Sequence, residues 1–145
     1  MPTSFQLVFD THDPDSEARF WIAALGYQLQ PPPDGFDSWE AALEAWGVPE
    51  ANRNDASAIV DPEGVRPRTY FQRVPEAKVA KNRLHMDLNV GGGRDVSFAE
   101  RKARVDAEVA RLSGLGATSE RGAIEKDEEY WVRMNDPEGN EFCVH

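Results

Sequence analysis

Residues 136–144 read DPEGNEFCV, and the four residues that open this stretch, DPEG, also stand at 61–64. Asp-Pro-x-Gly is typical of a tight turn, because proline fixes one turn position and glycine supplies a left-handed one. A second repeated feature precedes both turns: Leu25-Gly26 and Leu115-Gly116 each end a segment with helical periodicity. The ordered repeat predicts two related modules in one chain.

The first module is predicted to contain a strand, a helix and three further strands. The first strand covers residues 4–10, where Phe5, Leu7 and Phe9 alternate with Gln6 and Val8. The helix begins with Asp13 as N-cap and Pro14 at its first position. The later strands are expected at 27–30, 56–60 and 68–74.

The first half of the repeat is longer than the second. Gly26 and Asp61 are 35 positions apart, whereas Gly116 and Asp136 are 20 apart, a difference of 15. The excess falls on residues 31–55, which begin with three prolines and which we interpret as an insertion. A short helix is expected there from Ser38, its N-cap, to Trp46. Its tryptophans, Trp39 and Trp46, either cover the mouth of a cup in the fold or form the core of the insertion.

The second module repeats the same order of elements. A strand is predicted over 84–90, with Leu84, Met86 and Leu88 on one face and His85, Asp87 and Asn89 on the other. A helix is expected over 97–115, with a buried stripe of Val105, Val109, Leu112 and Leu115. Shorter strands follow around 117–119, 130–135 and 140–144, with an acidic turn at 125–129.

Composition limits the classes of partner. The 145 residues carry 26 acidic and 16 basic side chains, a formal charge of −10, which argues against binding to nucleic acid or to anionic membranes. One cysteine cannot form an internal disulfide, and no apolar run reaches about 20 residues. We therefore expect a cytoplasmic single domain over 1–145, with module one at 4–74, a linker at 75–83 and module two at 84–145.

Three stretches resemble the vicinal oxygen chelate superfamily, which includes glyoxalase I, bleomycin-resistance proteins and extradiol dioxygenases. They are FQLVFDTHDPDSEARFWIAALGY at 5–27, DPEGVRPRTYFQRVPEAKVAKNRLHMDLNV at 61–90 and DPEGNEFCV at 136–144. Within it, the chain is most similar to the glyoxalase-like domain family. The resemblance implies an α+β fold of two tandem βαβββ modules that form a half-open β cup, with the helices outside. It also implies a small-molecule ligand inside the cup and a homodimer.

The same resemblance implies positions for a divalent metal such as Zn, Ni, Mn or Fe. The corresponding ligands are Gln6, Gln72, His85 and Cys143, and the alternation of the strands independently places Gln6, His85 and Cys143 on the face away from the helices. Cys143 stands where the family usually has a glutamate, which weakens the site for a hard cation. Alternatively, His85 is a hydrogen-bonded cup residue, Cys143 a packing residue, and the two glutamines bind each other or water.

Further candidates come from the same predicted strands. Asp87 and Glu141 are candidate bases, while Asn89, Trp131 and Arg133 are candidate ligand-binding residues. Trp131 and Arg133 share one strand face, which would offer an aromatic wall and a cation; the alternative is an ordinary surface strand. Lys78, Lys81 and Arg83 form either a solvated loop or an anion site.

These observations lead to two candidate functions. The first is a small-molecule-binding protein of unknown ligand, which the lack of a carboxylate at Cys143 favours. The alternative is a metal-dependent lyase or isomerase of the glyoxalase type. Dioxygenase chemistry is disfavoured, because the positions do not supply two histidines and a carboxylate.

Overall fold

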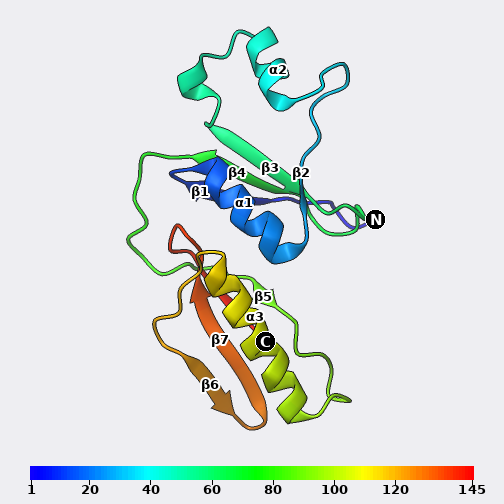
Figure 1. The fold of residues 1–145 in the computed structure, drawn as a ribbon, viewed down its shortest axis with the longest axis vertical. Coiled ribbons are helices and arrows are strands. Elements are labelled where there is room, and N and C mark those ends of the chain that lie inside the picture. The colour runs from blue at the N-terminus through cyan, green and yellow to red at the C-terminus, as the bar shows by residue number, and fades with distance from the viewer. The chain divides into compact units, whose positions relative to one another are not determined.

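The computed structural model describes residues 1–145, and the chain divides into two compact units. Unit 1 covers Met1–Ala77 and unit 2 covers Lys78–His145. Each unit holds one four-stranded sheet and follows the order βαβββ, with the additional short helices of unit 1 in the predicted insertion (Figure 1). The predicted α+β fold of two βαβββ modules is therefore confirmed. No helix is both long enough and apolar enough to span a membrane.

Unit 1 is built on a sheet with the strand order β1-β4-β3-β2. The elements are β1 (Leu7–Thr11), α1 (Pro14–Leu25), β2 (Gln28–Leu29), β3 (Ala56–Val60) and β4 (Thr69–Arg73). Asp13 caps α1 by accepting a hydrogen bond from the Ser16 N–H, and Gly26 ends it in the left-handed conformation. Trp21 of α1 and Phe71 of β4 are fully buried, so one face of the sheet packs against this helix.

The insertion contains α2 (Trp39–Ala45) and the 3-10 turn η1 (Glu50–Asn52), which Figure 1 shows on the chain that joins β2 to β3. Ser38 caps α2, as predicted. Trp46 packs edge-on against the rings of Phe36 and Trp39. The Trp39 indole also donates to the Gln30 carbonyl at 2.6 Å, which ties the insertion to the end of β2.

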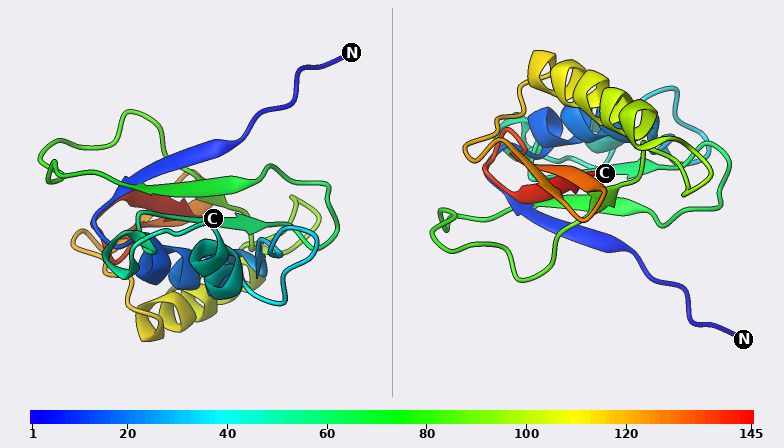
Figure 2. Two further views of the ribbon diagram at one scale, coloured as in Figure 1. Left: turned by 90° about the horizontal axis from the view of Figure 1, so that it is seen from above. Right: turned by 90° about the horizontal axis from the view of Figure 1, so that it is seen from below.

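Unit 2 has the strand order β5-β8-β7-β6, with β5 parallel to β8 (Figure 2 gives two further views of the elements). Its elements are β5 (Asp87–Leu88), α3 (Phe98–Gly114), β6 (Ala123–Lys126), β7 (Glu129–Asn135) and β8 (Glu141–Val144). Val105 and Leu112 of α3 are buried, as are Met134 of β7 and Phe142 of β8. The other face of this sheet carries the polar residues described below.

Four predictions for unit 2 need correction. The strand expected over 84–90 is only Asp87–Leu88, and Leu84 is 72% exposed. In the parallel register Asp87 pairs with Cys143, so an extension back to Leu84 would face Asn140, which Asp136 already holds in a turn. Leu115, predicted to be buried, is the exposed C-cap of α3.

The strand expected around 117–119 is only a single bridge between Thr118 and Asn135, and the strand of this part of the chain is β6. The acidic segment 125–129 is therefore mostly strand rather than turn. Glu125 and Lys126 belong to β6, which pairs with β7 through a two-residue loop at Asp127 and Glu128. Both loop residues have positive φ, the conformation that a tight hairpin requires and that Asn-Gly usually supplies. The sequence lacks that signal, and the tertiary pairing of the two strands selects the conformation.

Candidate functional site

Each Asp-Pro-x-Gly turn lies between the last two strands of its unit, β3 and β4 in unit 1 and β7 and β8 in unit 2. Asp136 is buried, and its Oδ1 accepts hydrogen bonds from the N–H groups of Glu138 and Asn140. Asp61 is equally buried and accepts from Glu63 and Arg66. The Glu63 N–H in particular lowers the pKa of Asp61. Each aspartate thus accepts hydrogen bonds that stabilise the connection between these two strands.

Polar side chains of unit 2 meet on the sheet face that is turned away from α3. Asp87 pairs with Cys143 across β5 and β8, and Cys143 pairs with Arg133 across β8 and β7. His85 Nε2 lies 3.3 Å from Asp87 Oδ1. One ligand atom from each of His85, Asp87 and Cys143 lies within 4.8 Å of the others. We call these three residues the unit 2 cluster.

His145 lies beside this cluster, although it was not among the residues predicted from the sequence. Its Nε2 lies 3.4 Å from Asp87 Oδ2, so that Asp87 stands between two imidazoles. Its ring stacks on Trp131, with 6.1 Å between centroids and 14° between planes. The alternation of Glu141, Cys143 and His145 along one strand was the signal that could have found it.

Cys143 is largely shielded from solvent, with 8% of its surface exposed. Burial raises the pKa of its thiol, and the negative charge and hydrogen bond of Asp87 raise it further, while Arg133 and Lys81 oppose them. The group therefore stays a neutral thiol near pH 7. A metal bound here would have to displace the thiol proton.

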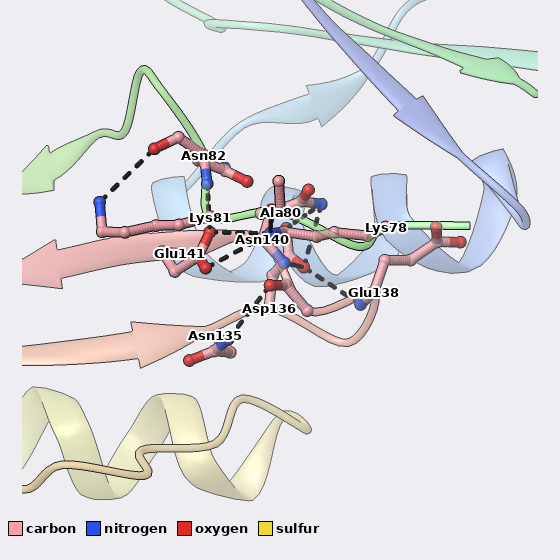
Figure 3. Close-up of polar contacts among 10 residues, drawn as sticks. Lys78, Ala80, Lys81, Asn82, Asn135, Asp136, Glu138, Asn140 and Glu141 are labelled. Atoms are coloured by element: carbon pink, nitrogen blue, oxygen red, sulfur yellow. Dashed lines mark hydrogen bonds and ion pairs between the residues drawn. The ribbon is translucent and has the colours of Figure 1, made fainter. Parts of the chain in front are cut away.

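Glu141, one of the two candidate bases, is held by the segment that leads into β5 (Figure 3). Its Oε2 accepts from the Asn82 N–H at 2.9 Å and lies 3.0 Å from the Lys78 ammonium. Burial alone would raise the pKa of Glu141, but the Asn82 N–H and Lys78 outweigh it and lower the pKa to about 2. Such a carboxylate is a weak base.

The remaining unit 2 candidates have simpler surroundings. Asn89 lines a cavity of about 180 Å³ together with His145 and Tyr130. Lys81 and Arg83 are exposed, and Lys81 donates to the Asn82 carbonyl.

The two glutamines of unit 1 lie on the face of the sheet away from α1 but are not neighbours. Gln6 Oε1 accepts from Arg68 Nη1 at 2.5 Å, and Gln72 Nε2 donates to Asp10 Oδ1 at 2.7 Å. Arg68 and Gln72 are four residues apart on one strand, roughly 13 Å at the usual rise. The structure therefore does not bring the two amide groups to one ion.

A larger cavity of about 340 Å³ lies in unit 1, between the insertion and the sheet. Trp39 and Leu43 of α2 line it on one side, and Ala56, Ala58 and Tyr70 of β3 and β4 on the other. Arg68 contributes a cation, with Tyr70 beneath its guanidinium. Trp39 lines this cavity, whereas Trp46 packs against Phe36 and Trp39 but is 54% exposed, so it does not form a buried core of the insertion.

The sequence profile of the glyoxalase-like domain matches residues 6–145. The chain belongs to the glyoxalase-like domain family. No curated protein matches it in sequence. The vicinal oxygen chelate superfamily predicted from the three stretches is confirmed by this match and by the solved structures below.

Solved structures share the fold of this glyoxalase-like chain at low identity. A protein from Agrobacterium tumefaciens is 16% identical, with a TM-score of 0.62 over 100% of this chain and 97% of the other. A glyoxalase/bleomycin resistance/dioxygenase family enzyme from Burkholderia phytofirmans is 15% identical, with a TM-score of 0.61 over 96% and 94%. A mutant fosfomycin resistance protein of Listeria monocytogenes, in complex with Mn(II) and a dihydroxypropylphosphonic acid, is 10% identical, with a TM-score of 0.60 over 100% and 90%.

The donor set of this glyoxalase-like chain suits a borderline metal better than a hard one. Imidazole, carboxylate and thiolate are all zinc ligands, whereas Mn²⁺ prefers oxygen. The unit 2 cluster offers one of each type, and His145 offers a second imidazole beside Asp87. A metal therefore fits the cluster chemically, with Gln6 and Gln72 belonging to the other unit.

Proposed function

We propose that this glyoxalase-like chain is a small-molecule-binding protein whose ligand occupies the cavity under the insertion of unit 1. The cavity of about 340 Å³ carries this proposal, since its volume falls in the range of small-molecule sites. Its walls are mainly apolar, with a few charged groups at fixed positions, as in most such sites. Ala56, Ala58 and Tyr70 of its lining lie on the sheet face away from Phe71. That face lines the cup in the family, which supports the expectation of a ligand held in the cup.

Fragment screening by two-dimensional NMR of the full-length chain tests this proposal. We expect hits from a library of aromatic and aliphatic compounds to shift the Trp39 indole N–H signal, because Trp39 lines the cavity. Leu43→Trp should abolish these shifts by filling the space. The matched control is Leu115→Trp, an exposed position in unit 2. Hits that bind Leu43→Trp as well as the parent would contradict the site.

The alternative function is a metal-dependent lyase or isomerase, and the unit 2 cluster favours it. His85, Asp87 and Cys143 would hold the metal, which would supply a Lewis acid for the oxygen atoms of a substrate. Asp87 would then be a ligand rather than the base, and Glu141 is a weak base in its ion pair with Lys78. The cluster thus gives stronger support to metal binding than to catalysis, because catalysis also needs a base.

Titration with Co²⁺ tests the alternative, because a thiolate ligand gives cobalt a charge-transfer band in the near ultraviolet. We expect this band to grow to one equivalent, to be lost in Cys143→Ser and to be weakened in His85→Ala. His12→Ala, an exposed histidine of unit 1, is the matched control. A band that survives Cys143→Ser, or none at a hundredfold excess of cobalt, would remove the support for a metal site.

A further inference from the structure

The unit 1 cavity contains a cation, Arg68, that has no carboxylate within ion-pair distance. We propose that the cavity selects a small, mainly apolar molecule that carries one carboxylate or comparable anionic group, and that Arg68 binds this group. This inference rests on the proposed binding function, to which it adds the chemical class of the ligand.

Arg68 is held in place by neutral partners. Its Nε donates to Gln30 Oε1 and its Nη1 to Gln6 Oε1, both at 2.5 Å. Its guanidinium carbon lies 5.1 Å from the centre of the Tyr70 ring. These contacts fix the position and plane of the guanidinium and leave its positive charge in place, because neither an amide nor a phenol carries an opposite charge.

The other charged residues of the lining are already paired. Asp15 lies 2.8 Å from Arg19, and Asp55 lies 3.2 Å from Arg73. Arg53 lies 3.7 Å from Glu40. Arg68 alone among the four has no carboxylate within ion-pair distance, in a chain with ten more acids than bases. A cavity arginine without a carboxylate partner, in a protein this acidic, points to an anionic ligand.

The remaining hydrogen-bonding capacity of Arg68 suits a carboxylate. A guanidinium has five N–H groups, and the two amides use one on Nε and one on Nη1. The edge formed by Nη1 and Nη2 keeps three, enough for the paired bonds that arginine makes with a carboxylate. The rest of the ligand would lie against Leu29, Trp39, Leu43 and Tyr70, which favours a flat or branched apolar body.

Isothermal titration calorimetry with 2-naphthoate and its neutral isostere 2-naphthamide tests the inference on the full chain. We expect naphthoate to bind about tenfold to a hundredfold more tightly than naphthamide, as for a hydrogen-bonded charged group. Salt should weaken only naphthoate binding. In Arg68→Gln the affinity for naphthoate should fall to that for naphthamide, and detectable binding of naphthamide shows that the cavity is intact. Arg121→Gln, an exposed position of unit 2, is the matched control.

The outcomes separate this inference from the proposed function. Equal affinities for both probes, unchanged in Arg68→Gln, would retain a binding cavity and overturn its anion selectivity. Binding of neither probe would also overturn the inference, and the fragment screen would still decide the function. If Arg68→Gln loses both probes, Arg68→Lys decides: a retained preference for naphthoate supports the role of the charge, and equal affinities exclude it.

Discussion

Gln6 and Arg68 are 62 residues apart in the chain and form a 2.5 Å hydrogen bond between the side chains next to β1 and β4. The parallel pairing of these strands puts them side by side, since Leu7 pairs with Thr69 one residue further on. Gln6 Oε1 therefore accepts a hydrogen bond from the Arg68 guanidinium. The lone pair that it uses is not available to a metal ion. This contact gives the amide a positioning role at the unit 1 cavity.

A carboxylate in place of this amide should impair anion binding. Gln6→Glu would give Arg68 an internal counter-ion at the same distance, so the affinity for 2-naphthoate should fall about tenfold while that for 2-naphthamide stays constant. Calorimetry checks both values. Gln28→Glu makes the same change at an exposed position of β2 and should alter neither. An undiminished naphthoate affinity in Gln6→Glu would show that Arg68 does not bind the anion.

The reactivity of Cys143 should depend on Asp87. Because burial and the Asp87 charge raise the pKa of the thiol, alkylation by iodoacetamide at pH 8 should be much slower in the folded chain than in denaturant. Asp87→Asn removes the negative charge, lowers the thiol pKa and should accelerate alkylation severalfold. Mass spectrometry measures the rate. Asp95→Asn, an exposed change elsewhere in unit 2, should leave the rate as it was.

The ion pair of Glu141 should make stability dependent on pH. The folded-state pKa of about 2 lies below the usual 4.5, so the pair stabilises the fold above about pH 4.5 and this contribution disappears as the pH falls towards 2. Glu141→Gln should cost on the order of 2 kcal/mol near neutrality. Urea unfolding at several pH values should show the difference shrinking in acid. A constant difference would mean that charge is not the cause, and Glu120→Gln serves as the exposed control.

The buried turn aspartates should matter for both units. Asp136→Ala leaves the N–H groups of Glu138 and Asn140 without their acceptor and should lower the free energy of unfolding by about 2 kcal/mol. Asp136→Asn keeps one oxygen and should cost less. Thermal unfolding followed by circular dichroism measures both variants. A similar cost for Asp61→Ala would match the repeat, whereas a neutral Asp136→Ala would contradict the role of this turn.

Some parts of the site were predictable because they depend on residues close in sequence. The caps Asp13 and Ser38 accept hydrogen bonds from the N–H group three residues later, as predicted. Ser97, where a helix was expected to begin, caps α3 in the same way. The alternation that put His85 and Cys143 on one face agrees with the unit 2 cluster. Such features follow from short-range geometry, which a sequence displays directly.

The register of the strands was not predictable in the same way. Gln72 stands beside Asp10 rather than Gln6 because the parallel ladder aligns β1 and β4 in only one register, and single-sequence alternation gives the face but not the neighbour. His145 is close to Asp87 for the same reason, across β5 and β8. The roles of these side chains depend on such neighbours.

By itself, the sequence determined the repeat, the two βαβββ modules, the site of the insertion and the family. The tertiary structure decided what those residues contact: Arg68 between two amides, Glu141 in an ion pair with Lys78, and a cavity under Trp39 and Leu43. The physical reason is the distance along the sequence between the residues that make each contact. Turns and caps are satisfied by hydrogen bonds within a few residues, whereas a cavity and its charge balance arise from side chains that only strand pairing and packing bring together.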